Sequence, residues 1–222
     1  MASNVDHNAL LLQVMAHDLL APLTAVKWQS ELLASAADDP AKRDRYLSGI
    51  QSSTELGITL TKHAHVAGKV LTESYVPDPS EGVLSDVIRT ALNDLHLQYE
   101  RHGIGLEVEM RDSETSRSVD VPLVSLYVWS LAKYFLTMTP ARGTVTFRGI
   151  PAEDGSYTVA VSAPDVPERE ECVRHFSDAL ARDAYDQTYV FIKLIKTAGP
   201  MVGATETVAA QEDLLLLETV FR

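Results

Sequence analysis

One long segment with a helical apolar period, MAHDLLAPLTAVKWQSELL over residues 15–33, constrains the fold more than any other stretch of the chain. A helix turns every 3.6 residues, so apolar side chains at spacings of three and four gather near one face. Here these side chains are Leu12, Met15, Leu19, Leu23, Val26 and Leu33. Such spacings indicate a seam that packs inside a helical bundle. His17 lies two residues from Met15 and from Leu19, so the sequence predicts that it points off the seam, toward solvent.

Three residues on this helix bear on chemistry: His17, Asp18 and Pro22. An exposed imidazole with an ordinary pKa near 6.5 is largely neutral at pH 7 and can act as a nucleophile. Asp18 can orient the ring or take its proton. Pro22 lacks an amide hydrogen, so it kinks or loosens the helix one turn later. A surface histidine beside an aspartate is usually a solvated pair, so a function here rests on the proline spacing and the seam as well.

The first part of the chain is predicted to be a helical hairpin. We expect one helix over residues 4–36 and a second over residues 41–74, joined by a turn at residues 37–40. In this turn Asp38 or Asp39 is a candidate helix cap, and Pro40 suits the first helical position. A single hairpin cannot cover its own apolar face, so we predict a homodimer in which two hairpins form a four-helix bundle. The alternative is that the hairpin packs on the second domain of its own chain.

The remaining sequence predicts an α+β domain. Residues 77–82 read as a linker, because they hold two prolines, a glycine and polar residues, and they divide a hairpin domain (1–76) from a second domain (83–222). The second domain is expected to be a mixed sheet with helices on one face. Its predicted elements are a helix at 83–101, a strand at 104–111, a polar loop at 112–119, a helix at 122–138, strands at 144–149 and 157–162, helices at 168–182 and 188–198, and strands at 204–210 and 214–221.

Composition narrows the class of protein. The net charge of −12 opposes binding to nucleic acid, and residues 77–222 carry most of it, with 23 acidic against 13 basic residues. The single cysteine, Cys172, excludes an internal disulfide and fits a reducing cytoplasm. No apolar run approaches the roughly 20 residues of a membrane span. We therefore expect a cytoplasmic protein that contacts neither nucleic acid nor membrane.

The residues around His17 resemble the phospho-acceptor motif of bacterial two-component histidine kinases, written H-D/E-L-x-x-P-L. His17, Asp18, Leu19, Pro22 and Leu23 all fit that pattern. The order of elements in residues 83–222 resembles the ATP-binding domain of the same kinases, which shares its fold with gyrase and Hsp90-type ATPases. Together the two resemblances span almost the whole chain, the second by pattern rather than by strong motif.

The resemblance also implies ATP-binding motifs, and this sequence departs from each of them. The family's N-x-x-x-N-A-x-K-Y/F motif precedes a T-P-x-G-G turn, which survives at residues 139–143. Counting back from that turn, Ser130 and Tyr134 stand where the asparagines would be, and Thr137 stands where the lysine would be. A tyrosine cannot replace a carboxamide as a compact Mg²⁺ ligand.

Two further motifs are altered. The family's D-x-G-x-G-I-P motif aligns with residues 161–167, where Val161 replaces the adenine-binding aspartate and Ala163 and Asp165 replace the glycines. The G-T-G-L-G-L motif aligns with residues 186–191, which contain no glycine. About four residues separate this stretch from the preceding predicted helix, which leaves little room for a nucleotide lid. A nucleotide site built from other residues stays open as an alternative.

The resemblance therefore favours a histidine-kinase-derived, dimeric histidine phosphotransferase of the ChpT-like type, with a hairpin of the HisKA type and a degenerate kinase domain. It implies that His17 receives a phosphoryl group from the aspartate of one receiver domain and passes it to another, with Asp18 assisting. A hybrid histidine kinase would lie upstream. The receiver would bring the Mg²⁺, so the chain needs no metal or nucleotide of its own. Leu20, Ala21, Pro22 and Leu23 would form part of the receiver-docking surface.

Two other functions stay open: an ATP-dependent histidine kinase with diverged motifs, and a scaffold that docks a receiver without phosphoryl transfer. Kinases tend to have Thr, Asn or Ser where Ala21 stands, and that residue is associated with dephosphorylating the partner, so we expect weak phosphatase action.

Other signals are set aside. His63 with His65, and Cys172 with His175, make poor metal pairs, and Trp28 and Trp129 are expected in the core.

Overall fold

The computed structural model describes residues 7–36, 39–112, 116–177, 187–211 and 214–222. These residues divide into two compact units, a helical unit up to Gly68 and a sheet-containing unit from Lys69 onward. The predicted α+β class is confirmed. Each unit is described by itself.

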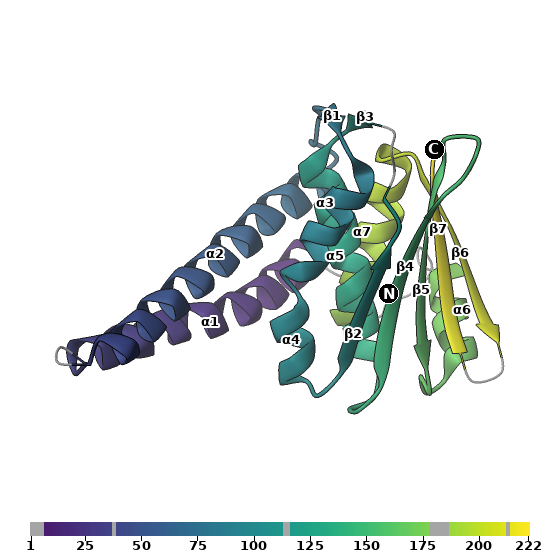
Figure 1. Ribbon diagram of the computed structural model, residues 1–222. Coiled ribbons are helices and arrows are strands. Elements are labelled where there is room, and N and C mark those ends of the chain that lie inside the picture. The colour runs from purple at the N-terminus through teal and green to yellow at the C-terminus, as the bar shows by residue number, and fades with distance from the viewer. Residues whose placement is uncertain (1–6, 37–38, 113–115, 178–186, 212–213) are drawn as a thin grey trace. The chain divides into compact units, whose positions relative to one another are not determined.

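The helical unit is an antiparallel hairpin of α1 (His7–Ala34) and α2 (Pro40–Leu71) (Figure 1). The two helices approach closely where Gly49 faces Gln29, because a β-carbon at Gly49 would collide with the Gln29 side chain. The carboxylate of Asp39 accepts a hydrogen bond from the amide of Lys42 at 3.1 Å, so Asp39 is the cap that the turn was predicted to contain. Pro40 is the first helical residue, where its missing amide hydrogen costs nothing.

The second unit is built on a five-stranded sheet in the order β2-β4-β5-β7-β6. β2 pairs with β4 in parallel, and the other neighbours are antiparallel. The strand bounds are β2 Gly105–Met110, β4 Thr144–Pro151, β5 Tyr157–Pro164, β6 Ala204–Gln211 and β7 Leu214–Phe221. All five lie within a residue or two of their predicted ranges, as expected for segments whose apolar residues alternate.

One face of this sheet is buried under helices. Side chains alternate between buried and partly exposed along β5 and through most of β4 and β7. The buried set includes Phe147, Val159, Val161, Leu215, Leu217 and Phe221. The helices are α3 (Leu84–Asn93), α4 (His96–Arg101), α5 (Val121–Met138), α6 (Arg169–Ser177) and α7 (Gln187–Met201). α5 is the central helix: it packs against α3 and α7, and most of its residues are buried (Figure 1).

Two predictions of local structure in this unit are corrected. The helix expected over residues 83–101 is broken into α3 and α4, because the chain turns at Asp94 and Leu95 and buries the Leu95 side chain. Part of the expected linker and the end of the expected polar loop form a two-stranded sheet, β1 (Ser80–Gly82) with β3 (Arg117–Val119). Strands of three residues are too short to show a period-two pattern.

A single buried carboxylate ties the segment after α2 to the N-terminus of α5. Asp120 accepts hydrogen bonds from the Tyr75 hydroxyl at 2.8 and 3.0 Å and from the Asp78 amide at 2.8 Å. It also caps α5 by accepting from the Leu123 amide at 2.9 Å. Burial and the Asp120 carboxylate raise the pKa of Tyr75, so this hydroxyl stays a hydrogen-bond donor over the whole physiological pH range.

Replacing Asp120 by alanine is expected to lower the free energy of unfolding by about 2–4 kcal/mol, because it removes a helix cap and leaves buried donors unsatisfied. Urea unfolding followed by circular dichroism measures the loss. Glu153→Ala, which removes an exposed carboxylate elsewhere in the same unit, is the matched control and should change stability by less than about 0.5 kcal/mol. Equal effects of the two substitutions would contradict the role given to Asp120.

Candidate functional site

His17 and Asp18 lie side by side on α1 with very different exposure. The His17 side chain is 79% exposed, as predicted, whereas that of Asp18 is 11% exposed. The imidazole Nδ1 is 3.4 Å from Asp18 Oδ1, a long hydrogen bond. If Nδ1 carries the proton and donates it to this carboxylate, the unshared electron pair lies on Nε2, on the solvent side. The arrangement presents a nucleophilic nitrogen outward and holds a negative charge behind the ring.

Pro22 is buried one turn further along the same helix. α1 continues through this proline without interruption. A helical residue normally donates its amide hydrogen to the carbonyl four residues earlier, which here belongs to Asp18. Because proline has no amide hydrogen, the turn that carries His17 and Asp18 has one hydrogen bond fewer than its neighbours.

The predicted docking residues are divided between surface and interior. Leu20 is 65% exposed, Leu23 is 60% exposed and Ala21 is also exposed, whereas Pro22 is buried. Leu12, Ala16, Leu20 and Leu23 follow one another at helical spacing and form an exposed apolar line that we call the α1 stripe. On α2, Leu47 and Ile58 are likewise about half exposed.

Two predictions about this helix differ from the exposures found in a single chain. Trp28 was expected in the core but is 61% exposed. Leu12, expected in the same seam as Met15, is 69% exposed, whereas Met15 is 3% exposed. The covered face of α1 is centred on Leu11, Val14 and Met15, and the α1 stripe lies beside it. The periodic apolar pattern was therefore wider than the face that one chain covers.

His63 on α2 is a buried residue whose role sequence reasoning missed. It is 4% exposed. The buried residues Leu60, His63, Ala67 and Val70 are separated by three, four and three positions, which is the spacing of one helix face. This spacing in the sequence indicated that His63 is buried. Burial lowers the pKa of His63 to about 4. The imidazole is therefore neutral in the folded protein at pH 7.

This burial makes stability depend on pH. The unfolded chain binds a proton at His63 below about pH 6.5, but the folded chain does so only near pH 4, so folding loses stability as the pH falls through this window. The loss attributable to His63 approaches about 3 kcal/mol at the acid end. Urea unfolding at pH 7 and at pH 4.5 measures it. His63→Gln should reduce the difference, and the exposed control His65→Gln should not. The same pH dependence in both variants would contradict this origin.

The positions that would bind Mg²⁺ in a kinase domain are packed into the core of the second unit. Tyr134 is 1% exposed, and its ring meets Phe176 of α6 edge-to-face with centroids 5.0 Å apart. Burial raises the pKa of the Tyr134 hydroxyl, which keeps it protonated. Ser130 is fully buried and donates its hydroxyl to the Leu126 carbonyl at 2.8 Å. Thr137 donates to the Tyr134 carbonyl at 2.7 Å, so its hydroxyl is engaged within the helix.

Lys133, on the same helix, contacts other parts of this unit. Its amino group lies 3.2 Å from the Gln98 side-chain oxygen on α4 and 6.0 Å from the centroid of the Trp129 ring. Trp129 is 1% exposed and confirms the core position that the sequence predicted. The Trp129 ring packs edge-to-face on the Phe191 ring of α7, with ring centroids 5.6 Å apart. Phe191 is the last residue of the glycine-free stretch 186–191, so this end of the third motif is part of the core.

The second altered motif has a left-handed backbone at Asp165, where the family pattern has glycine. Val161 and Ala163 are buried on β5, and Asp165 has a φ angle of 57°. Arg142, in the first glycine position of the T-P-x-G-G turn, has a φ angle of 71°. This left-handed region favours glycine, so the surrounding fold holds two other residues there. Residues 178–186, where a nucleotide lid was expected to be short, lie outside the described residues.

Comparisons with known proteins find similarity to bacterial sensor proteins. No family model matches the chain. Sensor protein QseC of Salmonella typhi is 24% identical over 167 residues, which are 75% of this chain and 36% of QseC. QseC of Escherichia coli strain K12 is 24% identical over 130 residues, or 59% of this chain and 29% of QseC. The chain thus spans about a third of the length of the curated relatives it matches.

Solved structures agree on the fold. A bacterial phosphotransferase matches with a TM-score of 0.56 and 15% identity, over 99% of this chain and 98% of the other. The histidine kinase AdeS of Acinetobacter baumannii matches with a TM-score of 0.51 and 11% identity, over 92% and 96%. The cytoplasmic segment of the histidine kinase QseC matches with a TM-score of 0.50 and 14% identity, over 71% and 89%. This chain is related to two-component histidine kinases.

Among the described residues, two helices are long and apolar enough to cross a membrane. The sequence had predicted no such segment. In Val121–Met138, which is α5, 72% of the apolar window is buried, as in a core helix of a soluble domain. In Ala9–Ala34, within α1, only 22% is buried, and this segment carries His17, Asp18 and Pro22. The cytoplasmic location stays a prediction.

Proposed function

We propose that this protein is a phosphorelay histidine phosphotransferase that carries a phosphoryl group on His17 between the aspartates of receiver domains. The observation that carries the proposal is the exposed His17 ring with its Nδ1 turned toward a largely covered carboxylate. The match to a bacterial phosphotransferase over nearly the full length of both chains supports it.

The geometry suggests how transfer would proceed. Nε2 of His17 attacks the phosphorus of an aspartyl phosphate, the N–P bond forms, and the bond between phosphorus and the aspartate oxygen breaks. The receiver's aspartate leaves as a carboxylate, and the positive charge on the imidazole is offset by Asp18. The reverse sequence on a second receiver returns the neutral imidazole. The receiver supplies the Mg²⁺ that neutralises the phosphoryl oxygens, so His17 needs only access and alignment.

We further propose a homodimer formed through the exposed apolar residues of the hairpin. The α1 stripe, with Leu47 and Ile58 on α2, leaves large apolar side chains in water on a single chain. A second hairpin would cover most of them and complete a four-helix bundle. Leu20 and Leu23, which lie near His17 on this stripe, would stay outside that contact and meet the receiver together with Ala21. Because Ala21 offers neither hydroxyl nor carboxamide to position a water molecule, dephosphorylation of the partner should be weak.

An ATP-dependent histidine kinase is the second candidate, favoured by the sequence relationship to sensor protein QseC. Isothermal titration with an ATP analogue and Mg²⁺ separates the two. We expect no saturable heat up to millimolar nucleotide, because Tyr134 and Val161 replace the groups that would bind metal and adenine. Binding at micromolar to sub-millimolar concentration would overturn the phosphotransferase proposal in favour of a kinase. A kinase domain with intact motifs serves as the positive control.

A further inference from the structure

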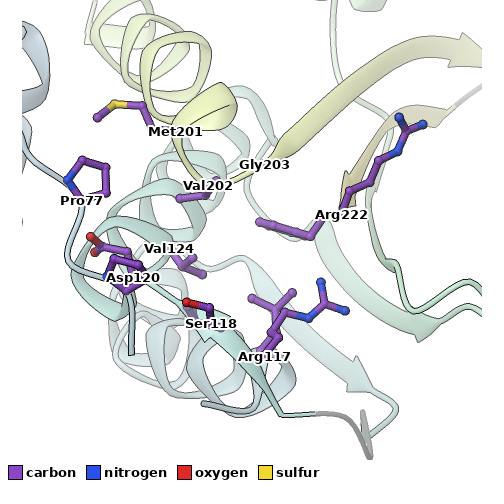
Figure 2. A pocket seen from close by; sticks show the side chains of 13 residues that line it. Pro77, Arg117, Ser118, Asp120, Val124, Met201, Val202, Gly203 and Arg222 are labelled. Atoms are coloured by element: carbon purple, nitrogen blue, oxygen red, sulfur yellow. The ribbon is translucent and has the colours of Figure 1, made fainter. Parts of the chain in front are cut away.

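The sheet-containing unit has a cavity of about 270 Å³ that the proposed phosphoryl transfer does not use. It lies where the C-terminal end of α7, the N-terminal end of α5 and strand β3 come together (Figure 2). Its walls combine polar groups with apolar side chains, and the apolar ones include Val119, Val124, Met201, Val202 and Phe221. The segment that follows α2 closes one side with Pro77 and Pro79. This volume is at the small end of the range for ligand pockets, so it suits a small molecule.

Two arginines and a serine give this cavity a basic side. Arg117, Ser118 and Arg222 line it together, and the same three residues line a shallower hollow beside it. The Arg117 Nη2 donates a hydrogen bond to the Gly155 carbonyl, a neutral acceptor. Among the described residues, no carboxylate lies within ion-pair distance of Arg117, whereas Arg89 pairs with Asp86 and Asp112 at 2.8 and 2.6 Å. Within the part of the chain that the structure describes, Arg117 is therefore a cation that no acid pairs with.

The carboxylates near the cavity are already engaged. Asp120 accepts from three donors, as described above, and lies at the positive end of α5. Asp154, in the adjoining hollow, accepts from the hydroxyl and the amide of Ser156 at 2.6 and 2.9 Å. These hydrogen bonds, followed by the charge of Arg222, lower the pKa of Asp154. Neither acid competes for the free donors of Arg117.

We propose that this cavity binds a small organic anion, a carboxylate or phosphate monoester that carries a short apolar group. The apolar group occupies the space between Val124, Val202 and Phe221, and the anionic group meets Arg117 and Arg222, with Ser118 as a further donor. In a domain whose charge is otherwise strongly negative, this site is specific for anions that also fill the apolar space. An occupant would touch Pro77 and Pro79, and so the segment that leads out of α2.

Binding of 4-phenylbutyrate to the full ¹⁵N-labelled chain, followed by NMR, tests the proposal. We expect saturable shifts centred on the amides of Val119, Val202 and Gly203, and at least fivefold weaker binding of the uncharged analogue 4-phenylbutan-1-ol. Phenyl phosphate, titrated in parallel, shows whether the site prefers a phosphate to a carboxylate. Equal affinity for acid and alcohol, no saturable binding of either anion, or shifts centred elsewhere would overturn the proposal.

Variants tie the binding to the named residues. Arg117→Gln and Arg222→Gln should each weaken binding of 4-phenylbutyrate at least fivefold, and the matched control Arg101→Gln, an exposed arginine on α4, should change it less than twofold. Ser118 is exposed, so Ser118→Trp should fold normally and block the cavity. Wild-type affinity in Arg117→Gln or Ser118→Trp would overturn the site. None of these readouts depends on phosphoryl transfer, so the test stands apart from the proposed function.

Discussion

Replacing His17 by glutamine is expected to abolish phosphoryl transfer, with a loss of at least a thousandfold in the rate at which a phosphorylated receiver loses its label to the protein. Glutamine has a similar size but no nucleophilic nitrogen, and no other described residue presents an exposed imidazole beside a covered carboxylate in this way. Transfer from a ³²P-labelled receiver, separated by gel electrophoresis, measures the rate. Because His17 is exposed, the substitution should leave the free energy of unfolding nearly unchanged.

His65→Gln is the matched control, because it removes another exposed histidine from the same hairpin and should retain wild-type transfer. Unchanged transfer in His17→Gln would show that another residue accepts the phosphoryl group, and absence of transfer to the wild-type protein would leave the scaffold as the better explanation. A graded result is expected for Asp18→Asn. This variant keeps the shape but not the charge behind the ring, so transfer should slow by about ten- to a hundredfold rather than stop.

Replacing Tyr134 by asparagine, the residue that the kinase pattern would have there, is expected to lower the free energy of unfolding by about 3–5 kcal/mol. The substitution removes a fully buried ring that packs against Phe176 and leaves an amide in an apolar core. Urea unfolding measures the loss. We expect no gain of nucleotide binding, because Val161 still occupies the position of the adenine-binding aspartate.

Two controls separate packing from other causes. Tyr134→Phe keeps the ring and should cost less than about 1.5 kcal/mol. Tyr46→Asn makes the same chemical change at a half-buried position of α2 and should cost much less than Tyr134→Asn. A mild effect of Tyr134→Asn, or nucleotide binding by that variant, would show that the region is an adaptable pocket rather than a filled core.

The sequence predicted the sheet better than the connections between its elements. β5 and β7 alternate buried and more exposed residues over eight positions, and β4 does so over most of its length, which is long enough for a period of two to be visible. β1 and β3 are three residues each, and only their pairing with each other defines them. The break between α3 and α4 was missed because apolar spacing alone does not show where a helix must end to bury Leu95.

Around His17 the sequence predicted the exposure of the imidazole but not how the neighbouring residues divide between surface and interior. The exposure of His17 followed from helical spacing. The exposure of Trp28 did not, because residue type alone does not show whether another part of the protein covers an aromatic side chain. His63 shows the opposite case, a polar residue in a buried row that spacing could have identified. The left-handed φ angles of Arg142 and Asp165 were outside what residue types indicate, since glycine is the usual sign of such positions.

The buried proline of α1 has a mechanical consequence. A helix resists bending because its hydrogen bonds stretch on the convex side, and the turn ending at Pro22 lacks one of these bonds already. The flexural stiffness of α1 is therefore lowest beside His17, and a bending fluctuation would concentrate there instead of spreading along the rod. A partner that pushes on either end of the hairpin would change the tilt of the imidazole first. Under the proposed function, the same joint would let the ring adjust to receivers of slightly different shape.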